Sequence, residues 1–280
     1  MKKLICLFLI ALAANVQAQK GIIFKMKYQP NHNYTMATGM TMNFDVNLSG
    51  NEDIIEKLKA QGLTQPMKAN MTMSLSGNTK TGQAAADNVF PMSVTYKFDQ
   101  MSVKIGDKDL PMPPKLNTST TIYGHAGKEG RFKADSISGN GMKDTSEKKI
   151  TQMMNAIQNK IKFPEKPLHV GDTFTQEMPI SIPITQGEGN TNISATYKLV
   201  SIENGLANFD VVQNANIQLN VKGVTLKITG AGTGKLVYSI KNSFPLDYKT
   251  NLNLAVDGNI SNTIIKGTVI MDGDYKYTIE

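Results

Sequence analysis

Residues 34–48 read YTMATGMTMNFDVNL, and this stretch decides the fold. Its even positions are apolar apart from one threonine, and its odd positions are polar or small. Because successive side chains of a strand point to opposite faces, this alternation predicts a half-buried antiparallel strand. The strand would extend about 50 Å at ~3.4 Å per residue, far beyond the usual length. We therefore expect it to coil strongly or to carry a bulge near Gly39.

The same alternation recurs along most of the chain. Asn204-Gly205 and Gly258-Asn259 have the composition of hairpin turns between such strands. The sequence therefore predicts a mainly β fold, with a long curved antiparallel sheet or open barrel. The other alternating stretches are 22–28, 67–75, 90–98, 178–184, 193–199, 217–221, 236–240, 252–256 and 275–279.

Two short helices are predicted to pack against the apolar face of this sheet. Ser49 or Asn51 would cap the first helix, which ends at Gly62. Asp144 would cap the second, with Glu147 in the capping-box position three residues later. One face of the second helix carries Ile150, Met153, Ile157 and Ile161.

The first eighteen residues have the layout of a secretory signal peptide. Lys2 and Lys3 precede the apolar run Leu4–Ala14, and cleavage is expected near Ala18. The run is too short for a permanent transmembrane helix, and no later apolar stretch is long enough for one. Cys6 lies inside the run and not at the cleavage point, so we expect no lipid anchor. The sequence predicts a periplasmic or secreted protein.

The mature chain, residues 19–280, is expected to form a single mainly β domain. Residues 106–114 and 162–170 are the two places where it could divide. No cysteine follows the signal peptide, so no disulfide can form. A chain of this length buries roughly 70–75% of its unfolded surface without disulfides.

The charge of the chain argues against a nucleic-acid partner. Lys and Arg total 30 against 23 Asp and Glu, a formal net charge of +7. Arg131 is the only arginine, whereas nucleic-acid recognition depends on the planar guanidinium fork. The basic excess lies in residues 128–166, where we interpret it as a solvated helix face and not as a membrane contact.

The sequence contains no recognisable catalytic, nucleotide-binding or metal-binding motif. His32, His125 and His169 stand near predicted turns without a metal-ligand spacing. Residues 230–235 only partly resemble a phosphate loop, because Leu236 follows the lysine, so their glycines indicate a bulge or close strand packing. We expect a non-enzymatic protein without cofactor or metal, with an unrecognised hydrolase as the minor alternative.

Methionine is unusually frequent, with 16 in the chain. Residues 40–42 and 71–73 both read Met-Thr-Met, which places two thioethers on one strand face about 7 Å apart. Soft sulfur ligands suit copper(I), but the same face carries apolar residues and is typical of a core or an adaptable apolar cavity. The residues predicted to line such a cavity are Met36, Met40, Met42, Phe44, Met71, Met73, Met92, Tyr96, Ile150, Met153 and Ile157.

Three functions fit these observations. The leading hypothesis is an exported, non-enzymatic protein of the cell envelope that binds a lipid or another apolar ligand. The alternative is a structural or protein-interaction module that uses strand 178–184, since Pro179 and Pro183 mark it as a sheet edge. Copper(I) binding through the two Met-x-Met pairs is the less favoured third function.

Two stretches resemble segments of uncharacterised exported proteins of Gram-negative bacteria. They are FP at 163–164 leading to PLHVGDTF at 167–174, and GKLVYSI at 234–240. With the strands around them they cover most of residues 160–250. Such proteins are similar in architecture to the lipoprotein-carrier group, and this resemblance implies a curved antiparallel sheet closed by helices over an apolar cavity. It implies no catalytic residues.

Overall fold

The computed structural model describes residues 21–60, 62–110, 119–139, 144–184, 187–221, 223–260 and 262–280. The predicted signal peptide and its cleavage site lie outside these residues. The helices are α2 (Glu52–Ala60) and α3 (Asp144–Lys160). The strands are β1 (Asn33–Ser49), β2 (Met67–Thr81), β3 (Phe90–Ile105), β4 (Lys108–Leu110), β5 (Thr120–Ala126), β6 (Phe132–Gly139), β7 (Thr173–Ile184), β8 (Gly187–Glu203), β9 (Leu206–Val221), β10 (Val224–Ser239), β11 (Phe244–Ile260) and β12 (Thr263–Ile279).

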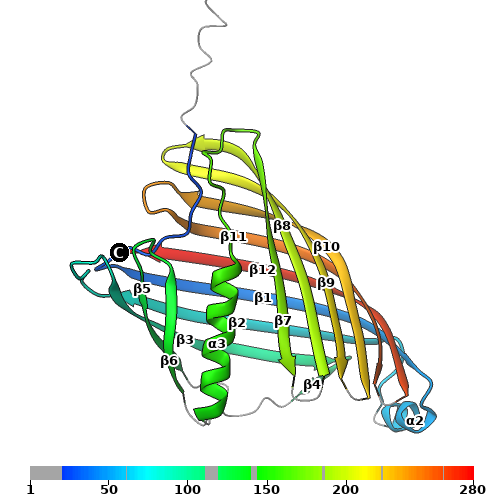
Figure 1. The fold of residues 1–280 in the computed structure, drawn as a ribbon. Coiled ribbons are helices and arrows are strands. Elements are labelled where there is room, and N and C mark those ends of the chain that lie inside the picture. The colour runs from blue at the N-terminus through cyan, green and yellow to red at the C-terminus, as the bar shows by residue number, and fades with distance from the viewer. Residues whose placement is uncertain are drawn as a thin grey trace, which may run out of the picture.

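All of these strands form one curved antiparallel sheet (Figure 1). Its order is β6-β5-β3-β2-β1-β12-β11-β10-β9-β8-β7, and β4 pairs with the far end of β3. The first and last strands along the chain are therefore neighbours in the middle of the sheet. The mainly β prediction is confirmed, and so is the prediction that strand 178–184, part of β7, lies at a sheet edge.

Helix α3 lies between the two edge strands β6 and β7, so the sheet does not close on itself (Figure 1). The Asn155 side chain accepts a hydrogen bond from Ala134 N at 2.9 Å and donates one to Ala134 O at 2.8 Å. This amide takes the place of a neighbouring strand beside β6. On the other side, Gln176 of β7 donates to Lys162 O at 3.2 Å, just after the helix.

Helix α2 lies at the end of the β1–β2 hairpin, away from α3 (Figure 1). Asn51, and not Ser49, caps it, because Asn51 Oδ1 accepts a hydrogen bond from Ile54 N at 3.3 Å. None of its residues is buried. Of the two predicted helices, only α3 therefore packs against the apolar side of the sheet.

Strand β1 accommodates its length by coiling. It pairs with β2 and with β12 without a register shift, so it carries no bulge at Gly39. Strand β10 likewise has no shift at Gly230, Gly232 or Gly234. At Gly232 a Cβ atom would lie 2.8 Å from Leu252 Cα and closer still to Asn251 O. Close strand packing, the second of the two predicted explanations, therefore accounts for these glycines.

Two local predictions have different outcomes. Asn204 and Gly205 form the β8–β9 turn with positive φ angles, as predicted. The predicted turn at Gly258-Asn259 is wrong, because both residues pair within the long strand β11. Gly258 is needed there for close approach, since a Cβ would lie 2.8 Å from Thr225 O.

The alternation of residues 22–28 predicts a strand, and this prediction is wrong except for a single bridge between Ile22 and Leu168. The segment is extended but runs across the end of the sheet. Lys27 N donates to Ser243 O at 3.0 Å, and Tyr28 N donates to Gly130 O at 3.0 Å. Its alternating side chains still point to one apolar side, which is why it resembles a strand in sequence.

The core has two parts at the end of the sheet crossed by this segment. The larger surrounds Phe24 and includes Leu199, Phe209, Leu236 and Tyr238 from β8, β9 and β10. The smaller lies between β3, β5, β6 and α3, and its buried residues are Phe90, Met92, Ile122, Ala126, Phe132, Ala134 and Ile137.

Candidate functional site

The two faces of the sheet differ in character, and the candidate site lies on the inner one. We call inner the face that carries Phe209 and Leu236 and that meets α3. Along β9 to β12 the inner positions are buried or half-buried except for Ile260 at the end of β11, whereas most outer positions are exposed. The inner side chains of these strands are mostly apolar or aromatic, and the outer ones are mostly Thr, Asn, Asp and Lys. Any apolar ligand would therefore contact the inner face.

An aromatic cavity of about 280 Å³ lies on this face, under α3 and the crossing segment 21–32. The inner residues of β8, β10, β11 and β12 form one wall. Segment 21–32, the loop at 130–132 and residues 158–163 form the other. Eight aromatic rings line it, those of Phe24, Tyr28, Phe132, Phe163, Tyr197, Tyr248, Tyr275 and Tyr277.

The tyrosines of this cavity stay protonated far above neutral pH. Burial raises the pKa of Tyr197 from 10.0 to about 12, with the nearby Tyr248 adding to the shift. Burial is also the main cause that raises the pKa of Tyr248, Tyr275 and Tyr277. The cavity wall therefore offers neutral hydroxyl groups that can donate hydrogen bonds.

Two hydroxyl groups at the border of the cavity lack a partner among the described residues. They are Thr38 Oγ1, in a residue that is 7% exposed, and Tyr248 Oη. Tyr248 lies near Thr250 and Gln213, but these two side chains hydrogen-bond to each other. Thr38 and Tyr248 belong to one row across the sheet, with Tyr275 of β12 between them. A ligand with a polar group could satisfy both.

Beyond this row the inner face carries six methionines on four neighbouring strands, which we call the methionine face. Direct cross-strand pairs join Met40 to Met73 and Met42 to Met71 between β1 and β2. Such partners have Cβ atoms about 4.5–5.5 Å apart. All six side chains are half-buried, so each keeps some contact with solvent. The six are Met40, Met42, Met71, Met73, Met101 and Met271.

The structure divides the predicted lining residues between two places. Met40, Met42, Met71 and Met73 lie together on the methionine face, with Phe44 in the next inner row. The others lie nearer the opposite end: Met36 packs against Gly77, while Met92, Tyr96 and Ile150 belong to the smaller core. Met153 and Ile157 are in α3, but their side chains lie outside the described part of the chain.

Sequence reasoning missed the tyrosines of the cavity and two methionines. Tyr275 and Tyr277 were recognised only as alternating strand residues, although two tyrosines on an inner face are a signal of a polar-edged cavity. Met101 and Met271 join the methionine face through the strand order, which places β3 beside β2 and β12 beside β1.

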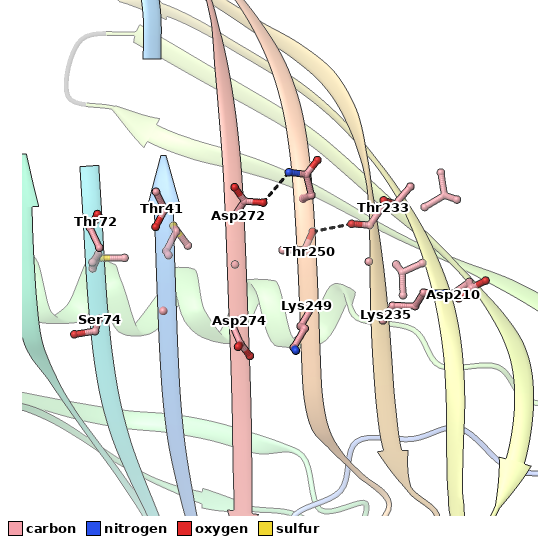
Figure 2. Close-up of a pocket in the computed structure, with 18 residues that line it drawn as sticks. Thr41, Thr72, Ser74, Asp210, Thr233, Lys235, Lys249, Thr250, Asp272 and Asp274 are labelled. Carbon is pink, nitrogen blue, oxygen red and sulfur yellow. Dashed lines mark hydrogen bonds and ion pairs between the residues drawn. The ribbon is translucent and has the colours of Figure 1, made fainter. Parts of the chain in front are cut away.

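A second hollow, of about 890 Å³, crosses six strands on the outer face (Figure 2). Several of its charged and amide side chains have a partner. Lys235 Nζ lies 2.5 Å from Asp210 Oδ1, and Asn251 donates to Asp272 at 2.7 Å. Asp274 lies 3.6 Å from Lys276 Nζ. This outer groove is a solvated polar surface, and we place no site in it.

The three histidines do not form a site. His125 Nδ1 lies 2.8 Å from Asp135 Oδ2, His169 Nδ1 lies 3.5 Å from Asp172 Oδ2, and His32 Nδ1 lies 2.7 Å from Pro30 O. Within the described ranges, no group of three His, Cys, Asp or Glu side chains could hold a metal ion. Within the described part of the chain, no helix is long and apolar enough to cross a membrane.

Comparisons with known proteins give only distant likenesses. No protein-family model and no curated protein matches the chain. An outer membrane channel from Pseudomonas putida F1 is 8% identical, with a TM-score of 0.26 over 90% of this chain and 97% of that one. A protein described as exported, with a YmcC-like fold, from Bacteroides fragilis NCTC 9343 is 12% identical, with a TM-score of 0.24 over 90% and 98%. Because these TM-scores are low, neither likeness indicates the fold or the function of this chain.

Proposed function

We propose that the chain is an exported, non-enzymatic protein of the cell envelope that binds a lipid or another apolar ligand along its inner face. The observation that carries the proposal is the partly exposed methionine face on the inner side of a curved sheet. The apolar residues of the larger core around Phe24 are almost fully buried, whereas those of the methionine face are not. The export part of the proposal rests on the signal peptide predicted from residues 1–18.

The chemistry of methionine fits such a role. The side chain is unbranched and polarizable, so a surface of six methionines can adapt to apolar molecules of different shapes. Covering half-exposed apolar area is favourable by about 25 cal/mol per Å² removed from water. The acyl chain of a bound lipid would cover this area without a change in the fold of the protein.

Titration with the neutral fluorophore N-phenyl-1-naphthylamine tests the proposal. We expect saturable binding to the wild-type protein, weakened about tenfold or more in Met40→Asn/Met73→Asn, because two amides replace paired apolar side chains of the inner face. The matched control is Thr41→Asn/Thr72→Asn, the next cross-strand pair, which points to the outer face and should bind like the wild type. Circular dichroism would verify that both variants fold.

The proposal fails if the wild-type protein binds no fluorophore. It also fails if Met40→Asn/Met73→Asn and Thr41→Asn/Thr72→Asn weaken binding equally. A specific envelope protein retained through β7 would in that case favour the interaction module.

Copper(I) binding is the second candidate, favoured by the gathering of six thioethers on adjacent strands. Met40→Leu/Met71→Leu separates the two functions, because leucine keeps the surface apolar but removes two sulfur ligands. A copper(I) function predicts loss of copper binding in this variant, whereas a lipid function predicts that fluorophore binding persists.

A further inference from the structure

The aromatic cavity carries a cation, which the methionine face does not. Among the described residues that line it, Arg131 is cationic and none is Asp or Glu, while the Lys25 side chain is exposed and alternates with the inward-facing Phe24 and Met26. Arg131 is the only arginine of the chain, and its guanidinium carbon lies 5.6 Å from the centre of the Phe163 ring. Its contact with Glu129 is a 3.5 Å pair to a carboxylate that is 80% exposed, so it neutralises little of the charge.

The cavity also has uncharged hydrogen-bond donors on its sheet side. Tyr248 Oη and Thr38 Oγ1, which have no partner among the described residues, lie in the row that separates the cavity from the methionine face. A guanidinium on one side and two hydroxyl groups on the sheet side can together hold a small anionic group.

Beyond that row the inner face has no charge. The inner positions of β1, β11 and β12 from Met40 to the far ends of these strands carry apolar residues or glycine, except for the buried Thr250 and Thr263. Along β12, Tyr275 of the cavity, Gly273 and Met271 follow one another on the same face, so the two regions adjoin. From Met40 to Leu48 the inner face extends about 27 Å at ~3.4 Å per residue, which is long enough for an extended acyl chain.

From this charge complementarity we infer that the ligand is an anionic lipid, with its head group at Arg131 in the aromatic cavity and its acyl chain along the methionine face. The inference rests on the proposed function and gives it a ligand class and an orientation. A neutral apolar molecule would leave the two hydroxyl groups without a partner and would form no charge-assisted hydrogen bond with Arg131.

Competition between matched ligands tests the orientation. Dodecanoate and 1-dodecanol share one apolar chain and differ in head-group charge, and each would displace N-phenyl-1-naphthylamine from the protein. We expect dodecanoate to compete about tenfold or more strongly than 1-dodecanol, because a charge-assisted hydrogen bond to arginine is stronger than a neutral one. In Arg131→Gln this preference should disappear, with 1-dodecanol competing as before. Lys227→Gln removes one exposed cation of the outer face and should keep the preference.

The outcomes separate the two proposals. If the wild-type protein binds the fluorophore but does not prefer dodecanoate, or if Arg131→Gln keeps the preference, the head-group site is wrong while apolar binding stands. If neither the fluorophore nor either competitor binds, the proposed function itself is wrong and the inference falls with it.

Discussion

Phe24→Ala should destabilise the protein by about 3–5 kcal/mol, the range found when a buried phenylalanine is truncated. Phe24 is 6% exposed, and its ring centre lies 4.8–6.1 Å from those of five others. Removing it leaves a cavity among rings that come from four elements and the segment after α3. The five neighbours are Phe163, Phe174, Tyr197, Phe209 and Tyr238.

Equilibrium unfolding in urea, followed by circular dichroism, measures this loss. Ile23→Ala is the matched control, since Ile23 is the preceding residue and is 48% exposed. It should change the free energy of unfolding by no more than about 0.5 kcal/mol. Equal effects of the two changes would mean that segment 21–32 does not hold the larger core together.

Gly232→Val should destabilise the protein by about 3 kcal/mol or more and prevent folding if the stability margin is small. Gly232 points to the inner side of β10, where a Cβ would overlap Asn251 O and lie 2.8 Å from Leu252 Cα. The neighbouring strand is held there by continuous pairing on both sides of β10, so its backbone cannot move away without loss of ladder hydrogen bonds.

Ala231→Val adds the same side chain one residue earlier, on the exposed outer face. Valine favours strand geometry, so this control should fold with near-normal stability. Thermal unfolding of the two variants compares them directly. A stable Gly232→Val protein would show that the curvature of the sheet does not depend on these glycines.

The alternation of residues predicted the strands well, because which face of a strand is apolar is a local property. Residues 34–48 form most of β1 as expected, and Asp144 begins α3. Segment 22–28 has the same alternation but crosses the end of the sheet. Its partners are loops more than 100 residues away, such as those at Gly130 and Ser243, and no local pattern contains that information.

The candidate site was only partly predictable, for a related reason. A period of two tells which face a side chain occupies, but not how far along the sheet it lies. The alternation alone therefore predicts one cavity for Met92 and Met40, although Met92 lies in the smaller core and Met40 on the methionine face. The aromatic cavity combines Phe24, Tyr197 and Tyr277, which come together only through the strand order.

The most direct test of a lipid site on the inner face is photolabelling with a dodecanoate that carries a diazirine near the end of its chain, followed by mass-spectrometric location of the adducts. The account predicts adducts on inner residues of β1, β2 and β12, such as Met40, Met73 and Met271, which unlabelled dodecanoate suppresses. Adducts confined to outer residues such as Thr41 and Thr72, or labelling that unlabelled dodecanoate does not reduce, would contradict it.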